Sequence, residues 1–294
     1  IMKQTLLIEL LTEELPPKAL ERLSTVFANE VFTELRGQEL AGEDSICTPF
    51  ATPRRLALTI TNVASQQTDR VIERKGPAVA AGVDAEGKPS KALEGFMRGA
   101  GVTFEQLQRN NDDKTEYFVA RIEKKGQPLD VYLADITTQA LKKLPIPKLM
   151  RWGDSDHQFV RPVHGLVMLH GDRIVPGEVL GLQSGRLTNG HRFLHTGEMP
   201  VVSANSYEEA LLTHGKVIAS FEKRRTRIDE HLKAKAHELN ARINPSDGLL
   251  DEVTALVEWP AVYVGEFEEE YLEVPQECLI LTMQQNQKYF PLLD

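Results

Sequence analysis

The chain has 294 residues, of which 41% are hydrophobic and 26% charged, and its formal net charge is −9. This is the composition of an ordinary globular protein, and the length predicts about two domains. A disordered chain is therefore excluded, and so is a membrane-spanning helix, because no apolar run approaches the roughly 20 residues that such a helix needs.

Cysteine is rare in the sequence. Cys47 and Cys278 are the only two, so a disulfide framework or a cysteine-rich zinc site is not expected. Sparse cysteine suits a reducing compartment, and no signal-peptide pattern opens the sequence. We therefore expect a cytoplasmic protein.

The acidic charge is unevenly distributed. Residues 247–277 contain ten carboxylates and no lysine or arginine, so this segment contributes −10 and the rest of the chain sums to +1. A mildly basic face can therefore coexist with an acidic protein. We expect the acidic segment to face solvent, or a basic partner, and to point away from any phosphate.

Residues 1–65 are expected to form an N-terminal α+β unit. An apolar strand at 5–11 precedes a helix over 20–37, and alternation over 56–63 indicates a half-buried strand. Glu13 and Glu14 stand where that helix begins and favour its dipole, which is a simpler role than a catalytic carboxylate pair. Arg54 and Arg55 lead into the second strand and would point to opposite faces, so at most one would reach a given ligand.

The next segment, 66–113, is expected to form a small inserted helical module or arm, because its turns enclose one helical piece at 90–98. From 114 to 294 we expect a second α+β domain that packs with residues 1–65. Its first elements are a strand at 117–122 and a helix at 129–144. Later come a helix at 250–256, a strand at 262–264 and a helix at 275–285. A further strand begins at 288, which suggests a longer protein.

Residues 151–195 organise the chain. They hold five of the eight histidines and five arginines, and these polar clusters alternate with the short apolar runs 166–169 and 174–175. Polar groups at the ends of strands gather on one edge of a sheet. The predicted basic rim consists of Arg151, Trp152, Arg161, His164, His191 and Arg192.

Cations, imidazoles and an indole on one rim suit an anionic partner with flat groups, such as a nucleic acid. The alternative is that the arginines pair with Asp154, Asp156, Asp172 and Glu178 and only brace loops. A further cationic group, Lys223, Arg224 and Arg227, opens a helix predicted from 220 to about 242. These three side chains either hold a phosphate or are neutralised by nearby carboxylates.

Motifs of several enzyme classes are absent from the sequence. There is no GxxxxGK loop, no GxGxxG fingerprint and no serine hydrolase elbow. The histidines lack HExxH spacing, and His164 and His170 would lie about 20 Å apart on a strand. The residues therefore predict no catalytic group and no metal site.

Eight runs, spread in order over the whole chain, resemble the beta subunit of the bacterial heterotetrameric glycyl-tRNA synthetase. They are LLIELLTEELPPKAL (6–20), ATPRRLAL (51–58), RKGP (74–77), MRWG (150–153), FVRPVHGL (159–166), SGRLTNGHRFL (184–194), ALVEWPAVYVGEF (255–267) and TMQQNQKYFPLLD (282–294). The runs SGRLTNGHRFL and QKYFP carry the resemblance most strongly.

The resemblance implies the N-terminal part of the beta subunit of an α2β2 ligase that charges tRNA(Gly) with glycine, using ATP and magnesium. The adenylation site is then expected on the alpha subunit. The beta subunit would bind tRNA and be required for aminoacylation, and its N-terminal part would include a domain like the B3/B4 module of phenylalanyl-tRNA synthetase. This chain would hold no cofactor and would not be catalytic alone.

Within that reading, Arg54 or Arg55, Arg151, Arg161, Arg192 and Arg224 are the expected phosphate contacts, with His191 at a phosphate or ribose and Trp152 stacked on an unpaired base. Two alternatives stay open. One is an editing-type hydrolase of mischarged tRNA, which needs a water-activating group such as His191 or Glu178. The other is a scaffold that docks the alpha subunit through an apolar or acidic surface.

Overall fold

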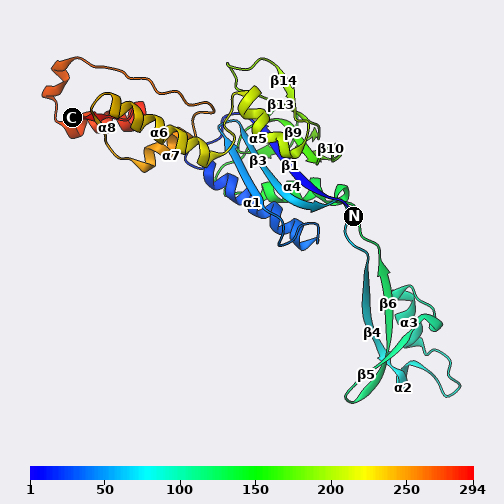
Figure 1. Ribbon diagram of the computed structural model, residues 1–294. Helices are drawn as coiled ribbons and strands as arrows, with labels where there is room; N and C mark the ends of the chain where they lie inside the picture. The colour runs from blue at the N-terminus through cyan, green and yellow to red at the C-terminus, as the bar shows by residue number, and fades with distance from the viewer. The chain divides into compact units, whose positions relative to one another are not determined.

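The computed structural model describes residues 1–294, and the chain folds into two compact units (Figure 1). One unit is Gln66–Pro128, and the other combines Met2–Ser65 with Leu129–Asp294. The strands pair antiparallel in several small sheets, and helices pack on them. The α+β class expected from the sequence is confirmed. No helix is both long enough and apolar enough to cross a membrane.

A five-stranded antiparallel sheet forms the centre of the larger unit, in the order β10-β9-β1-β3-β2. Its strands are β1 (Lys3–Thr12), β2 (Cys47–Thr52), β3 (Arg55–Ala64), β9 (Val163–His170) and β10 (Arg173–Ile174). β1 lies in the middle and is buried from Leu6 to Thr12, because both of its faces are covered. The strands predicted at 5–11, 56–63 and 166–169 are confirmed.

The two faces of the sheet have different partners. On one face, Leu6, Ile8 and Leu10 pack with α1 (Leu20–Gly37) and α4 (Leu129–Lys142), both of which the apolar spacing predicted. On the other face, Leu7 packs with apolar residues of the segment 199–219. Because side chains alternate along a strand, Glu9 points to the same face as Leu7. The apolar cluster on the face with α1 and α4 is the first core, and the one on the face with Leu7 is the second core. The carboxylate of Glu9 therefore lies in the second core.

Short elements surround the central sheet, and those of the segment 199–215 cover its second face. They are β7 (Met150–Arg151), β8 (Gln158–Phe159), β11 (Glu178–Val179), β12 (Leu182–Gln183), β13 (Leu187–Asn189), β14 (Glu198–Pro200), η2 (Ala204–Ser206), α5 (Tyr207–Ala210) and the π-helix η3 (Leu211–Gly215). β13 pairs with β14, and the loop between them forms part of the candidate site.

The C-terminal part is a helical extension of the same unit. It contains α6 (Phe221–Glu238), β15 (Arg242–Ile243), α7 (Asp247–Thr254), η4 (Glu269–Glu273), α8 (Gln276–Thr282), the π-helix η5 (Met283–Gln287) and β16 (Leu292–Leu293). The strand predicted at 262–264 is wrong, because these residues have no pairing partner and Tyr263 is 90% exposed. Ser220 caps α6 by accepting a hydrogen bond from the amide of Lys223, as a helix start requires.

The inserted unit is built on a three-stranded antiparallel sheet in the order β4-β6-β5. Its elements are β4 (Arg70–Ala78), α2 (Val79–Gly82), α3 (Lys91–Ala100), η1 (Phe104–Gln106), β5 (Gln108–Asp112) and β6 (Thr115–Lys124). β6 is the central strand, so the unit extends to Pro128 rather than ending near residue 113. Extended segments rich in charge conceal this pairing in the sequence.

Candidate functional site

The β2–β3 hairpin sends two neighbouring arginines in different directions. Thr52 and Arg55 face each other across its turn, which contains Arg54. Backbone hydrogen bonds tie this turn to the end of β1: the Thr12 amide donates to the Arg54 carbonyl at 2.8 Å. Arg55 enters the second core and is 1% exposed, whereas the side chain of Arg54 is 28% exposed.

Arg55 is the centre of a buried network that also contains Glu9, Thr52, Tyr207 and Glu258. Its guanidinium donates to Glu9 at 3.2 Å and to the Asn189 carbonyl at 2.9 Å, and it lies 3.6 Å from Glu258. Burial lowers the pKa of Arg55, but the carboxylates of Glu258 and Glu9 outweigh burial and hold the pKa above its usual value. The side chain is therefore a fixed cation.

Tyr207 completes this buried network from α5. Its hydroxyl donates a short hydrogen bond to the Glu9 carboxylate. Burial and the neighbouring Glu9 raise the pKa of Tyr207 well above its usual value. The phenol therefore stays protonated and remains a donor. On the other side, the Thr52 hydroxyl donates to Glu258 at 2.7 Å.

Arg224 is the second fully buried arginine. Its guanidinium donates to the carbonyls of Thr254, Ile218 and Ala51 at 3.0, 2.7 and 2.8 Å. Burial lowers its pKa to about 9, which still leaves the group charged at neutral pH. A guanidinium that is 0% exposed and engaged at all three nitrogens cannot meet a phosphate outside the fold. The sequence assignment of Arg224 and Arg55 as external phosphate contacts is therefore corrected.

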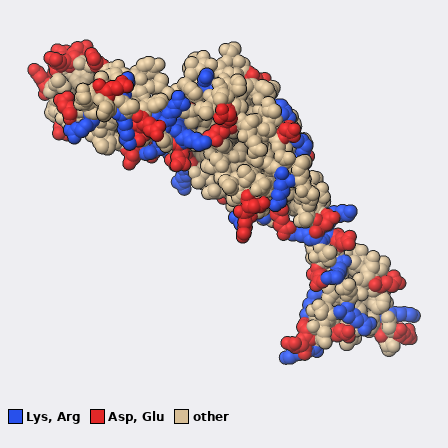
Figure 2. Space-filling view, in the orientation of Figure 1, with Lys and Arg blue, Asp and Glu red and all other residues tan.

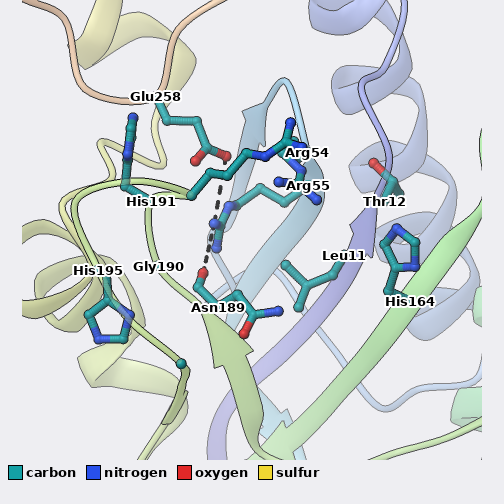
Figure 3. A pocket seen from close by; sticks show the side chains of 12 residues that line it. Leu11, Thr12, Arg54, Arg55, His164, Asn189, Gly190, His191, His195 and Glu258 are labelled. Carbon is teal, nitrogen blue, oxygen red and sulfur yellow. Dashed lines mark hydrogen bonds and ion pairs between the residues drawn. The ribbon is translucent and has the colours of Figure 1, made fainter.

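A pocket of about 190 Å³ opens above the buried network (Figure 3). It lies between the ends of three strands and the β13–β14 loop. Its lining residues are Leu11, Thr12, Arg54, Arg55, His164, Asn189, Gly190, His191, Arg192, His195, Gly197 and Glu258. The sequence assigned Arg54, Arg55, His191 and Arg192 as contacts, and the fold brings these four together with His164.

Two side chains of the pocket wall have buried polar atoms without a partner. The Thr12 hydroxyl accepts and donates no hydrogen bond, although the residue is 1% exposed. The Nδ1 atom of His195 is buried and unpaired in the same way. Buried polar atoms are nearly always hydrogen-bonded, so unpaired ones beside a pocket point to a polar group that is bound there.

The β13–β14 loop is held firmly. The amides of Phe193 and Leu194 donate to His191 Nδ1 at 3.1 and 3.2 Å, and the His191 amide donates to the Gly215 carbonyl at 2.6 Å. A side chain at Gly190 would come within 2.6 Å of that same carbonyl oxygen, which explains the glycine. His191 is thereby fixed with Nδ1 as an acceptor.

The mouth of the pocket carries cations with loosely placed partners. Arg54 lies 4.0 Å from Glu13, and Arg192 lies 3.9 Å from Glu14. Both distances exceed hydrogen-bonding range, and neither guanidinium donates a hydrogen bond within the chain. His164 is engaged more closely, with Nε2 at 2.8 Å from Glu13. Glu13 and Glu14 therefore border the pocket mouth, which the sequence interpretation of them did not foresee.

The remaining members of the predicted basic rim do not line the pocket. Arg151 pairs with Asp156 at 3.1 Å, which is one of the bracing pairs considered in the sequence. Arg161 donates to the carbonyls of Glu14 and Val160 at 2.9 and 2.8 Å. Trp152 is partly buried against the first core, so its ring is committed to packing.

The cations at the start of α6 also have partners within the fold. Lys223 bonds Glu208 at 2.6 Å, and the Arg227 guanidinium lies 4.8 Å from the centre of the Trp259 ring. Together with the burial of Arg224, these contacts account for the cluster without a phosphate. Across the face shown in Figure 2, lysines and arginines alternate with carboxylates, and acidic side chains gather over the C-terminal segment.

Residues 6–294 match the family described as the glycyl-tRNA synthetase beta subunit. Relatives named glycine–tRNA ligase beta subunit are 55% identical over 294 residues in Neisseria meningitidis serogroup B (strain MC58) and 52% identical over 293 residues in Aromatoleum aromaticum. The relative from Proteus mirabilis is 47% identical over 291 residues.

The alignments cover 99–100% of this chain but only 42–43% of those relatives. The chain thus spans about two fifths of the length of the proteins that it matches. Since the family match extends over nearly the whole sequence, this chain belongs to the glycyl-tRNA synthetase beta subunit family.

Proposed function

We propose that this chain is the tRNA-binding and positioning part of the beta subunit of a glycine–tRNA ligase. The observation that carries the proposal is the pair of guanidinium groups at the pocket mouth, Arg54 and Arg192. Neither group donates a hydrogen bond within the chain, and both line a pocket whose wall holds unpaired polar atoms. Family membership supports tRNA as the RNA and glycine–tRNA ligation as the reaction.

In the proposed complex, Arg54 and Arg192 neutralise backbone phosphates, and His191 contacts a phosphate or ribose oxygen. A planar guanidinium matches the geometry of a phosphate, so two such groups orient the backbone as well as attract it. Arg151 and Arg161 keep part of their surface exposed, but each already has partners within the fold, so we propose them as weaker, outer contacts. Binding of this kind weakens steeply as salt rises.

The catalytic work is proposed to lie elsewhere in the ligase. The term "beta subunit" in the names of the relatives implies a second kind of subunit. We propose an α2β2 assembly in which the alpha subunit uses ATP and magnesium to activate glycine and then charges tRNA(Gly). The chain described here would hold the tRNA in register for that step, and orientation alone supplies a large rate factor.

A second candidate is hydrolysis of mischarged tRNA, in a unit related to the B3/B4 module of phenylalanyl-tRNA synthetase. His195, which lines the pocket, favours it, because an imidazole can accept a proton from water. Glu258 is less suited, since Arg55 and Thr52 already hold it. Release of amino acid from mischarged tRNA(Gly) above background, lost in His195→Gln, is the result that this candidate requires.

A third candidate is a scaffold for the alpha subunit. Exposed apolar side chains of the C-terminal segment favour it, among them Tyr263 at 90% and Leu272 at 65% exposure. Co-purification of the chain with the alpha subunit tests this role. The scaffold and the tRNA contact use different surfaces and are compatible.

The main proposal is tested by tRNA(Gly) binding over a range of salt concentrations. Arg54→Met with Arg192→Met removes two phosphate contacts, so the slope of log affinity against log salt should fall by about 1.4 to 1.8. Arg173→Met is the matched control, because Arg173 pairs with Asp130 at 2.8 Å and does not line the pocket. An unchanged slope in the double variant would refute the proposal.

A further inference from the structure

We propose that the pocket accepts the phosphate of one unpaired nucleotide and that the exposed ring of Phe193 stacks on the base of that nucleotide. The inference rests on the proposed tRNA contact and specifies how one nucleotide is held. It adds Phe193 and Thr12 to the binding residues, neither of which the sequence indicated as an RNA contact.

The donors that face the pocket favour an anion. Arg54 and Arg192 have unused guanidinium donors, and the Thr12 hydroxyl is a donor without an acceptor. His191 Nδ1 accepts two amide hydrogens, so the proton of the neutral imidazole sits on Nε2, which is then a donor as well. Four donors from three separate segments of the chain thus line one pocket. Figure 3 shows Thr12, Arg54 and His191 among them.

Charge within the pocket points the same way. Its lining includes three arginines and one carboxylate, Glu258. Glu258 is 7% exposed and is already occupied by Arg55 and the Thr52 hydroxyl. Glu13 and Glu14 remain outside at the mouth, where a phosphate can displace them from Arg54 and Arg192 because those pairs are long and solvated.

The size of the pocket limits what enters. Sites for drug-sized molecules hold roughly 300–1,000 Å³. The volume of about 190 Å³ here is smaller, so it suits a phosphate with part of a sugar but not a whole nucleotide. The base of a bound nucleotide must therefore remain outside, beside the mouth.

Phe193 stands where that base would lie. The ring is 83% exposed, yet its backbone is fixed by the hydrogen bond from its amide to His191. Its neighbours His191 and Arg192 both line the pocket, and the Arg192 guanidinium lies 5.6 Å from the centre of the Phe193 ring. A rigid loop that holds an aromatic ring in solvent next to cations is the arrangement of a stacking platform.

Three probes separate the two halves of the site: adenosine 5′-monophosphate, adenosine and inorganic phosphate, each titrated into the whole chain by calorimetry or NMR. The monophosphate should bind at least about fivefold more tightly than either of the others, because it alone uses both the pocket and the ring. Equal affinity for the monophosphate and adenosine would overturn the proposal.

Two substitutions then assign the halves. Thr12→Val removes only an unpaired hydroxyl, so it should fold normally and lower the affinity for phosphate and for the monophosphate alike, by about tenfold. Phe193→Leu should lower the affinity for the monophosphate by about fivefold and leave phosphate binding unchanged. Tyr263→Leu, an exposed aromatic of the C-terminal segment, is the control and should change neither.

The outcome separates this inference from the proposed function. If tRNA binds with the expected salt dependence while Thr12→Val and Phe193→Leu leave every probe unaffected, the nucleotide site is refuted and the tRNA contact stands. If tRNA does not bind at all, the proposed function itself fails. An effect of Phe193→Leu on alpha-subunit association but not on the probes would assign the ring to a protein contact and overturn the stacking role.

Discussion

Arg54 and Arg55 are adjacent in the sequence and opposite in environment. Arg55 is 1% exposed, and two buried carboxylates, a hydroxyl and a carbonyl surround its guanidinium. Arg54 lies in the hairpin turn with its nearest carboxylate at 4.0 Å. Arg55 belongs to the buried network beneath the pocket, and Arg54 belongs to the pocket mouth.

Whether its donors are already engaged, rather than its residue type, separates a structural cation from one that is available for binding. A guanidinium whose donors are all engaged has no capacity left for a ligand, whereas unused donors beside a pocket do. By this criterion Arg55 and Arg224 hold the fold together, and Arg54 and Arg192 are available.

Removal of the buried cation should give the largest effect. Arg55→Met leaves Glu9 and Glu258 buried without their counter-charge, so the free energy of unfolding should fall by about 3–5 kcal/mol. Urea denaturation measures it. Arg54→Met is the matched control next to it and should cost less than about 1 kcal/mol. Similar losses in the two variants would abolish the distinction between the two regions.

Tyr207→Phe should have an intermediate effect. It deletes the hydroxyl that donates to Glu9, whose second carboxylate oxygen already lacks a partner. A buried carboxylate that loses a donor costs about 1–3 kcal/mol in the free energy of unfolding. Tyr263→Phe, at a residue that is 90% exposed, should leave the denaturation midpoint in place. A neutral result for Tyr207→Phe would mean that water replaces the phenol.

Much of the architecture was predictable from the sequence, because it is encoded by local periodicity. The helices α1 and α4 and the strands β1, β3 and β9 each follow from the spacing of apolar residues over ten or so positions. Three residues that the sequence singled out in the stretch 151–195, His164, His191 and Arg192, line one pocket. These features depend on residues that are near one another along the chain.

What the sequence could not supply is pairing across long separations. Arg55 bonds Glu9, which is 46 residues away, and Arg224 bonds the carbonyl of Ala51, which is 173 residues away. No local pattern distinguishes such a buried cation from an exposed one. Thr12 could not be singled out either, because only the fold shows that its buried hydroxyl has no partner. Phe193 looked like an ordinary apolar residue until the loop left it exposed.

Like the arginines, the histidines include buried and exposed members, and the pH dependence of stability tests this difference. His170 is 2% exposed and donates from Nε2 to the Val63 carbonyl at 2.7 Å. Burial lowers its pKa below the usual value. Below about pH 6.5 the unfolded chain therefore binds more protons than the folded chain. The free energy of unfolding should then rise with pH and fall as the pH drops below about 6.5, by at most about 1.4 kcal/mol per pH unit.

Denaturation midpoints between about pH 7 and pH 5 reveal this slope. His170→Gln should flatten it by the share that His170 contributes, and His231→Gln, at an exposed position on α6, should not. A wild-type slope that persists in His170→Gln would show that some other group carries the pH dependence.

The smallest effect is expected at Arg151, which marks the outer limit of the binding region. Its side chain is 61% exposed and that of its partner Asp156 is fully exposed, so Arg151→Met should change the free energy of unfolding by less than about 1 kcal/mol. The difference should vanish near 1 M salt, where the screening length falls to about 3 Å. Arg151→Met should also reduce the salt slope of tRNA binding less than Arg192→Met does. An equal reduction would mean that donors already paired with a carboxylate are as available as free ones. The contrast between Arg54 and Arg55 would then fail.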